Sequence, residues 1–358
     1  MFTSFKGSHL VNSYHKKKLK NRFQMTGYVK AIIAAVVAIV IALLPTEMLG
    51  IADLNPVQQR VIAIFVFAAI MWLTEAIPSW CTSVLIIVIM LFTISNKGLT
   101  PLMGVEGASY VSYKAIMACF ANPTILLFIG GFILAIALTK TGIDVVLAKE
   151  LLAPFGSKSE NVLLGFIIVT ATFSAFVSNT ATAAMMLAFL TPVLRAMPEG
   201  SKDRVALTMA IPLGANIGGI ATPIGTPPNT IVLGYLSDNL GINIGFGEWM
   251  LKMIPFVVIL LLAGWVLLRF MFPFQQKKID LVIDGELHWT YKTWIVIITF
   301  IATIFLWCFA DVFDIGLNSF IVALVPVAVF AVSGVITKHD LEEINWSVLW
   351  MVAGGFAL

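Results

Sequence analysis

Long apolar runs recur along this chain and determine the surroundings in which it folds. Runs of about 18 or more mostly apolar residues are long enough to cross a bilayer as helices. Only 11% of the residues are charged and 59% are hydrophobic, whereas soluble proteins carry about a quarter charged residues. The short alternating segments of a membrane β-barrel are not seen. The sequence therefore predicts an all-α polytopic membrane protein, with spans near 28–44, 57–75, 79–95, 122–143, 249–272, 292–310 and 316–336.

The placement of positive charge predicts the orientation of these spans. Lysines and one arginine crowd the segment between Lys16 and Arg22, just before the first span. Cytoplasmic segments of membrane proteins carry an excess of Lys and Arg. Residues 45–56, which follow the first span, contain acids and neither Lys nor Arg. We therefore expect a multi-pass protein of the cytoplasmic (inner) membrane with its N-terminus in the cytoplasm.

Residues 159–196 form one apolar stretch that is too long for one span and has no polar turn for two. Lys158 precedes the stretch and Arg195 lies at its end, so the charge rule places both ends inside. A segment that enters and leaves on one side is a re-entrant hairpin. Its midpoint falls at residue 177 or 178, which puts the polar triplet Ser178–Thr180 at the tip, near the middle of the bilayer.

The next stretch, residues 205–236, carries no charge and is interrupted by glycines and prolines between Gly214 and Pro228. Non-helical backbone survives at membrane depth only where protein or a water-filled cavity satisfies its polar groups. The pattern predicts a helix broken around 222–229. Pro227 and Pro228 suit the first turn of the helix after the break.

A broken helix that faces a hairpin tip offers carbonyl and hydroxyl oxygens, which suit a hard cation such as Na⁺. Helix N-termini at the same place attract anions. We expect Asn179 or Thr180 to cap a helix that starts at Ala181. Because this region has no Lys or Arg, an anion would depend on a neighbouring cation for positive charge, which is the physical basis of symport.

Simpler interpretations remain open for each of these residues. Serine and threonine often bond to a carbonyl of their own helix, and Asn179 would also suit a contact between two helices. Gly214, Gly218 and Gly219 would equally form a packing face. The cysteines Cys81, Cys119 and Cys308 are expected to be structural thiols, and no nucleophile–base pair or metal cluster lies within the spans. An enzyme is therefore not expected, and a channel is disfavoured because no charged ring or filter sequence is present.

A short pattern also repeats along the chain. "LFIGGFILA" (127–135) returns as "MVAGGFAL" (351–358), and the charge rule gives the two copies opposite directions. Inverted repeats are typical of secondary transporters, although small residues at helix contacts produce similar patterns. The second copy stands at the last residues of the sequence. We therefore expect the second repeat to be incomplete and the chain to be a C-terminally truncated fragment.

Three motifs resemble those of the divalent anion:sodium symporter family, which carries dicarboxylates, citrate or sulfate: "TEAIP" (74–78), "SNTATAAMML" (178–187) and "IGTPPN" (224–229). The resemblance runs from about residue 28 and implies an elevator-type inverted-repeat transporter that forms homodimers. Together with the charge pattern, the resemblance divides the chain into successive segments. These are a basic arm at 1–27, scaffold spans at 28–158, the hairpin at 159–196, the broken helix of the transport part at 205–248, a span with a cytoplasmic loop at 249–291, and the start of the second repeat at 292–358.

The resemblance also assigns roles to individual residues. It implies sodium binding by Ser174, Ser178, Asn179 and the carbonyl of Gly225, and substrate contacts by Asn179, Thr180, Thr226 and Pro227. The family's second Ser-Asn-Thr hairpin and second "TPPN" break are absent here, which leaves transport by this chain alone in question.

We therefore expect Na⁺-coupled uptake of a divalent anion, first of all a C4-dicarboxylate such as succinate. Transport of sulfate or citrate, Na⁺-independent exchange on the same fold, and a non-transporting fragment are the alternatives. The expected partners are the anion, Na⁺ as coupling ion, membrane lipid and a second copy of the chain. Neither another cofactor nor a nucleic acid is expected.

Overall fold

A computed structural model describes residues 27–104, 109–279, 289–310, 313 and 316–358. The basic segment predicted at 1–27 lies, up to residue 26, outside the described residues. The described residues form helices, with two isolated β-bridges between loop segments. They divide into two compact units, the first reaching to Asn122 and including Trp346–Leu358, the second running from Pro123 to Asn345.

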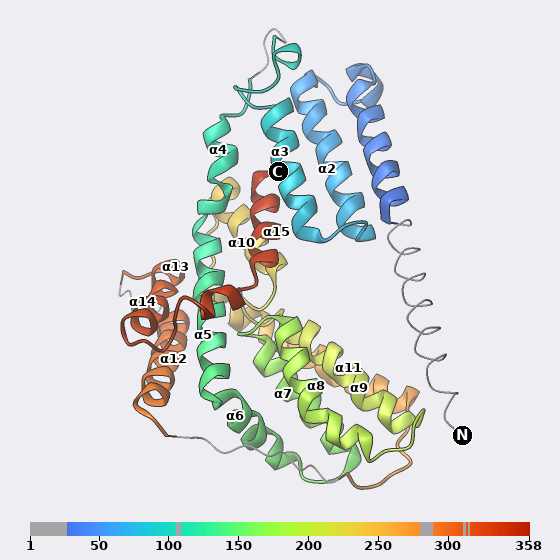
Figure 1. Cartoon of the computed structure of the whole chain (residues 1–358). Coiled ribbons are helices and arrows are strands. Elements are labelled where there is room, and N and C mark those ends of the chain that lie inside the picture. The colour runs from blue at the N-terminus through green and yellow to red at the C-terminus, as the bar shows by residue number, and fades with distance from the viewer. Residues whose placement is uncertain (1–26, 105–108, 280–288, 311–312, 314–315) are drawn as a thin grey trace, which may run out of the picture. The chain divides into compact units, whose positions relative to one another are not determined.

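The first unit is a group of helices around a core that contains Phe67, Met71 and Ile86. Asn55 starts α2 with a capping box to Gln58, and α15 packs closely against α3 (Figure 1). Its helices are Gly27–Leu43, α2 (Pro56–Thr74), α3 (Ser79–Thr93), α4 (Tyr113–Ala118) and α15 (Trp346–Ala357), with 3₁₀ turns at Thr46–Leu49, Thr100–Leu102 and Cys119–Ala121.

The second unit contains the predicted hairpin and the predicted broken helix. Helices α7, α8, α9 and α11 lie together, and α12 and α14 pack beside α5 (Figure 1). The helices are α5 (Pro123–Thr141), α6 (Ile143–Leu152), α7 (Ser159–Ser174), α8 (Asn179–Arg195), α9 (Lys202–Gly218), α10 (Pro227–Leu240), α11 (Phe246–Met271), α12 (Tyr291–Phe309), α13 (Ser319–Val322) and α14 (Leu324–Val332), with 3₁₀ turns at Ala153–Phe155 and Asp340–Glu343.

Within the described residues, four helices are long and apolar enough to cross a membrane: Pro56–Thr74, Tyr113–Thr141, Phe246–Met271 and Tyr291–Phe309. Three of them match the spans predicted at 57–75, 249–272 and 292–310, and the fourth contains α5 (Pro123–Thr141), which matches the span predicted at 122–143. The span predicted at 316–336 is shorter and is divided at Ala323. The backbone of Ala323 approaches Gly130 of α5 so closely that a Cβ on the glycine would overlap its carbonyl.

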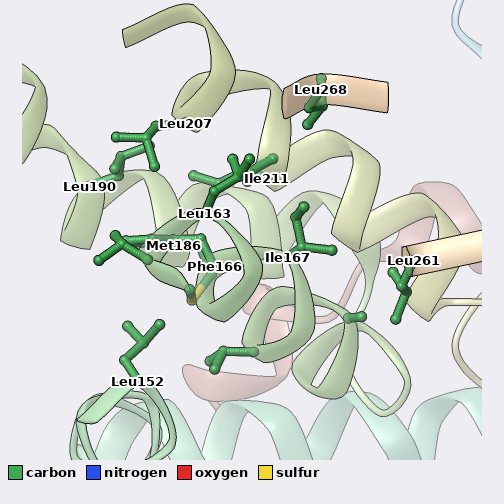
Figure 2. Close-up of a cluster of buried hydrophobic side chains, with 14 of the residues drawn as sticks. Leu152, Leu163, Phe166, Ile167, Met186, Leu190, Leu207, Ile211, Leu261 and Leu268 are labelled. Carbon is green, nitrogen blue, oxygen red and sulfur yellow. The ribbon is translucent and has the colours of Figure 1, made fainter. Parts of the chain in front are cut away.

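The core of the second unit lies between the hairpin helices and α9. Phe166, Ile167, Met186, Leu190 and Ile211 are fully buried there, and α6 and α11 contribute further apolar side chains (Figure 2). In a membrane, where lipid is as apolar as these side chains, van der Waals packing of this kind holds helices together.

Two glycines bring α9 against α7. A Cβ on Gly214 would lie 2.6 Å from the carbonyl oxygen of Ile167, and one on Gly218 would overlap the backbone of Ala171. Small residues let two helix backbones approach closely. This contact fixes the end of α7, and therefore the hairpin turn, beside the end of α9.

Candidate functional site

The hairpin turn consists of residues 175–178, between the end of α7 at Ser174 and the start of α8 at Asn179. Ser178 is the N-cap of α8, and its hydroxyl accepts a hydrogen bond from the amide of Ala181 at 3.3 Å. The expectation that Asn179 or Thr180 caps a helix starting at Ala181 is therefore wrong. Helix α8 begins two residues earlier, which leaves the Asn179 side chain available for other contacts.

The break between α9 and α10 spans residues 219–226. Pro227 and Pro228 occupy the first turn of α10, as the sequence predicted. Thr222 fastens the break to the hairpin turn, because its hydroxyl donates to the carbonyl of Ala175 and accepts from the amide of Gly225 at 3.1 Å.

Asn229 fastens the break from the other side. This side chain is 7% exposed, and its amide nitrogen donates to the carbonyl oxygens of Gly219 (2.9 Å) and Thr222 (2.8 Å). Trp249 of α11 adds an indole hydrogen bond to the carbonyl of Ile220 at 3.1 Å. Irregular backbone is thus satisfied by protein groups, as burial of such a segment requires.

Four polar groups meet where the hairpin turn and the break touch. Ser174 is fully buried, and its hydroxyl donates to the carbonyl of Ala215 at 2.7 Å. The Asn179 Oδ1 atom lies 2.7 Å from Ser174 Oγ, 3.3 Å from the Ala215 oxygen and 3.2 Å from the Gly225 oxygen. We call Ser174, Asn179, Ala215 and Gly225 the oxygen cluster.

The amide of Asn179 can face this cluster in two ways. With its nitrogen turned inward, its two N–H groups face three acceptors within reach, Ser174 Oγ and the carbonyl oxygens of Ala215 and Gly225. With its oxygen turned inward, the cluster consists of four oxygen atoms. No hydrogen-bond donor then lies between the Asn179 oxygen and the two carbonyl oxygens. The first arrangement suits an empty site, and the second is the ligand set that a hard cation prefers.

The absence of a side chain at Gly219 lets its backbone lie directly against the cluster. A Cβ at this position would lie 2.6 Å from Asn179 Oδ1 and 3.2 Å from the Gly225 carbonyl. A Cβ on Gly225 would in turn overlap the backbone of Gly219. Of the three glycines considered as a packing face, Gly214 and Gly218 pack against α7, whereas Gly219 faces the cluster.

The groups around the cluster are neutral, so any positive potential comes from helix ends. Helix α8 starts at Asn179, and its first amides point out of the helix end with the positive end of the dipole. Helix α10 starts with Pro227 and Pro228, which have no N–H to offer. The N-terminus of α8 is therefore the better of the two for binding an anion.

The residues singled out from the sequence divide into two groups. Ser174, Asn179 and Gly225 meet in the oxygen cluster, whereas the Ser178 hydroxyl is used as a helix cap. Thr180 is exposed on α8, and Thr226 and Pro227 are half-buried at the start of α10. Sequence reasoning missed the residues Ala215, Gly219, Thr222 and Asn229.

Of the missed residues, Asn229 had a signal, because it is the last letter of "IGTPPN". Ala215 contributes only its carbonyl, and Gly219 contributes only the lack of a side chain. Neither residue is therefore marked by a recognisable sequence pattern. Among the residues that the structure describes, no group of three or more His, Cys, Asp or Glu side chains could hold a metal ion.

Comparison with known proteins shows that the chain is similar to a family of transporters and to individual transporters. A family profile described as "Citrate transporter" matches residues 69–358. An uncharacterized transporter, C3B8.04c of Schizosaccharomyces pombe, is 33% identical over 91% of this chain and 37% of its own length. The inorganic phosphate transporter PHO87 of Saccharomyces cerevisiae is 32% identical over 87% of this chain and 33% of its own length.

A bacterial relative is similar over more of its length. The sodium-dependent dicarboxylate transporter SdcS of Staphylococcus saprophyticus is 29% identical over 96% of this chain and 69% of its own length. The chain thus spans about a third of the two yeast relatives and about two thirds of the bacterial one.

Proposed function

The chain belongs to the citrate transporter family, and on that premise we propose that it serves Na⁺-coupled symport of a divalent anion, first of all a C4-dicarboxylate such as succinate. Its relatives are transporters rather than enzymes. The family and the apolar helices make it a multi-pass membrane protein. Beyond family membership and membrane location, we propose Na⁺ as the coupling ion, a C4-dicarboxylate as the substrate and the cytoplasmic membrane as the location.

The oxygen cluster is the observation that carries the sodium part of the proposal. With the Asn179 oxygen turned inward, the side-chain oxygens of Ser174 and Asn179 converge from the two ends of the hairpin turn. The carbonyl oxygens of Ala215 on α9 and Gly225 within the helix break complete the set. Gly219 keeps the adjoining space free of a side chain. Neutral oxygen ligands hold a monovalent ion weakly enough to let it go again, which a transport cycle requires.

The anion would bind next to the ion, at the start of α8. Its carboxylate would accept hydrogen bonds from the first amides of α8 and from Asn179 and Thr180, with Thr226 and Pro227 lining the other side. Because no Lys or Arg belongs to this group, the bound Na⁺ supplies the positive charge at close range. Anion affinity then depends on sodium, and binding of the two is coupled.

Inorganic phosphate is a second candidate substrate. The yeast relative PHO87, an inorganic phosphate transporter, is 32% identical to this chain, which is no less than the 29% of the dicarboxylate transporter. Amide and hydroxyl donors at a helix N-terminus suit phosphate and carboxylate alike. Sulfate and citrate, or Na⁺-independent exchange, would use the same donors.

The family resemblance extends the proposal to assembly and movement. It supports a homodimer in lipid and an elevator-type cycle in which α7–α10 belong to the moving part. Chemical crosslinking of the protein in native membranes would test the dimer, since a monomeric band at all crosslinker concentrations would contradict it.

The experiment is uptake by proteoliposomes that contain the purified chain. Radiolabelled succinate and phosphate are offered in parallel, with and without an inward Na⁺ gradient. Ser174→Ala removes a ligand of the oxygen cluster. Thr172→Ala is the matched control, because Thr172 lies on the same helix and its exposed hydroxyl donates to the Ile168 carbonyl of that helix.

We expect succinate uptake that requires Na⁺, that is abolished by Ser174→Ala and that survives Thr172→Ala. Uptake of phosphate alone would establish the second candidate. Uptake that is equal with and without sodium, but requires an internal anion, would replace symport by exchange. Na⁺ titration of thermal stability in detergent gives an independent measure of ion binding by the same variants.

A further inference from the structure

A small, mostly apolar pocket with three polar side chains lies beside the hairpin turn in the second unit. It is a cavity of about 40 Å³ lined by the ends of α5 and α6 and by the hairpin residues on both sides of the turn. Thr139, Asp144 and Thr182 are its polar lining residues, and Val177 and Ala181 are among the apolar ones. None of the four residues of the oxygen cluster lines it.

Asp144 is a buried carboxylate in this pocket. It is 5% exposed, with one oxygen accepting from Thr139 Oγ1 at 2.9 Å and the other from the amide of Val145 at 2.8 Å. Burial raises the pKa of the Asp144 carboxyl, and these hydrogen bonds oppose that rise. An ionised carboxylate taken out of water is costly without a counter-charge.

Two charged groups on neighbouring elements are engaged elsewhere. On α5, the Lys140 ammonium lies 2.6 Å from Asp340, and on α7, Glu160 is paired with Arg269 at 2.7 Å. Among the residues that the structure describes, Asp144 itself forms no ion pair. The carboxylate therefore has lone pairs to spare and no cation from the protein to balance them.

Thr182 provides a second unusual group in the same pocket. It is fully buried on α8, and its hydroxyl has no hydrogen-bond partner within the described part of the chain. Two other threonines of these helices, Thr141 and Thr191, each bond to a carbonyl one turn back. A free hydroxyl that lines the same cavity as an unbalanced carboxylate indicates a missing partner between them.

We propose that this pocket binds a sodium ion through the Asp144 carboxylate and the hydroxyls of Thr139 and Thr182. The cavity exceeds the roughly 10–15 Å³ that one water needs, and it is far too small for an organic anion. All three ligands are hard oxygens, and their single negative charge balances a monovalent ion. A calcium ion takes 6–8 oxygens, more than these three side chains supply.

A sodium ion here would join the α5–α6 corner to the hairpin. Thr139 and Asp144 belong to that corner, whereas Thr182 lies one turn into α8, close to its cap Ser178. Occupancy would therefore hold the hairpin turn in place from the side opposite to the helix break. The proposal does not rest on the oxygen cluster, since the two sites share no ligand.

The test measures Na⁺-dependent thermal stabilisation of the full chain in detergent, with choline as the reference cation. The background variant Asn179→Ala removes the oxygen cluster as an ion site. A ligand that binds only the folded state raises stability with its concentration. We expect Asn179→Ala to keep part of the stabilisation, and Asp144→Asn in that background to abolish it.

Two further variants keep the result interpretable. Thr182→Val removes the unpartnered hydroxyl at nearly constant volume, and we expect the Na⁺ dissociation constant to rise roughly tenfold, which is about 1.4 kcal/mol. Asp53→Asn is the control, since Asp53 is an exposed acid in the first unit with a left-handed backbone that asparagine also adopts. Equal Na⁺ stabilisation with and without the Asp144 carboxylate would overturn the proposal.

A proton is the competing occupant, and infrared spectroscopy distinguishes it from sodium. A protonated carboxylic acid has its own C=O stretching band, which Asp144→Asn would remove. We expect no such band at neutral pH in saturating Na⁺. A band that persists there and disappears in Asp144→Asn would overturn the sodium site and assign a buried acid instead.

Discussion

Replacing Gly219 by alanine separates ion binding from folding. The new Cβ would lie 2.6 Å from Asn179 Oδ1 and 3.2 Å from the Gly225 carbonyl. Ordinary C···O contacts begin near 3.3 Å, so the amide of Asn179 must withdraw by roughly 0.5–1 Å. The backbone of Gly219 is right-handed helical, with φ −58° and ψ −20°, so alanine adds no backbone strain.

The size of the effect follows from what Asn179 loses. One charge-assisted ligand contact contributes about 1.5–3 kcal/mol, which corresponds to a roughly 10- to 150-fold weaker Na⁺ affinity. Folding changes less, because alanine at a helix end gains about 0.5–1 kcal/mol over glycine while displaced hydrogen bonds cost about 1 kcal/mol each. The free energy of unfolding should stay within about 2 kcal/mol of the original.

The assay is Na⁺ titration of the melting temperature in an Asp144→Asn background, which removes the second proposed sodium site, with Gly218→Ala as the contrast. A Cβ on Gly218 meets the backbone of Ala171, which cannot turn aside. That variant should lose about 1–3 kcal/mol of stability from overpacking. A folded Gly219→Ala protein with unchanged Na⁺ affinity would refute the assignment of the oxygen cluster as an ion site.

Two further predictions concern groups that hold the second unit together. Asn229→Ala removes two buried hydrogen bonds to the backbone of residues 219–222 and should lower the free energy of unfolding, measured by chemical denaturation, by about 2–4 kcal/mol. Asn239 is an exposed residue on the same helix, and Asn239→Ala should change the free energy of unfolding little. Burial raises the pKa of Asp340, but the Lys140 ammonium and nearby hydrogen bonds lower it to about 2. A carboxyl with a depressed folded pKa contributes stability above its unfolded pKa of about 3.9. We therefore expect this contribution to fade as the pH falls from about 4 towards 2, and to be smaller in a Lys140→Met variant, which keeps only the Thr337 hydrogen bonds.

The parts of the fold that follow from local chemistry were predictable from the sequence. Apolar length located α2, α11 and α12 to within a few residues. Pro227 and Pro228 marked the start of α10, because proline lacks the N–H that the first turn leaves unbonded. The polar triplet at 178–180 lay close to a turn but did not match it, since Ser178 is the last turn residue and Asn179 and Thr180 already belong to α8.

The parts that depend on packing were not predictable. The helix cap fell on Ser178 because contact between α7 and α9 sets where the hairpin turns. Gly218 and Gly219 are adjacent and identical in sequence, yet one packs against Ala171 and the other borders Asn179. Asp144 and Thr182 lie far apart in the chain, and only the packing of the hairpin against the α5–α6 corner brings them to one cavity.

The glycine contact between α7 and α9 has a mechanical consequence. Where two backbones touch at Gly214 and Gly218, the larger side chains on either side of the contact resist sliding along the helix axes. Close contact of this kind opposes relative sliding of α7 and α9. Ser174 lies at the end of α7 and Ala215 lies on α9, so in the proposed transport cycle the distance between these two proposed ligands would be preserved while the helices move.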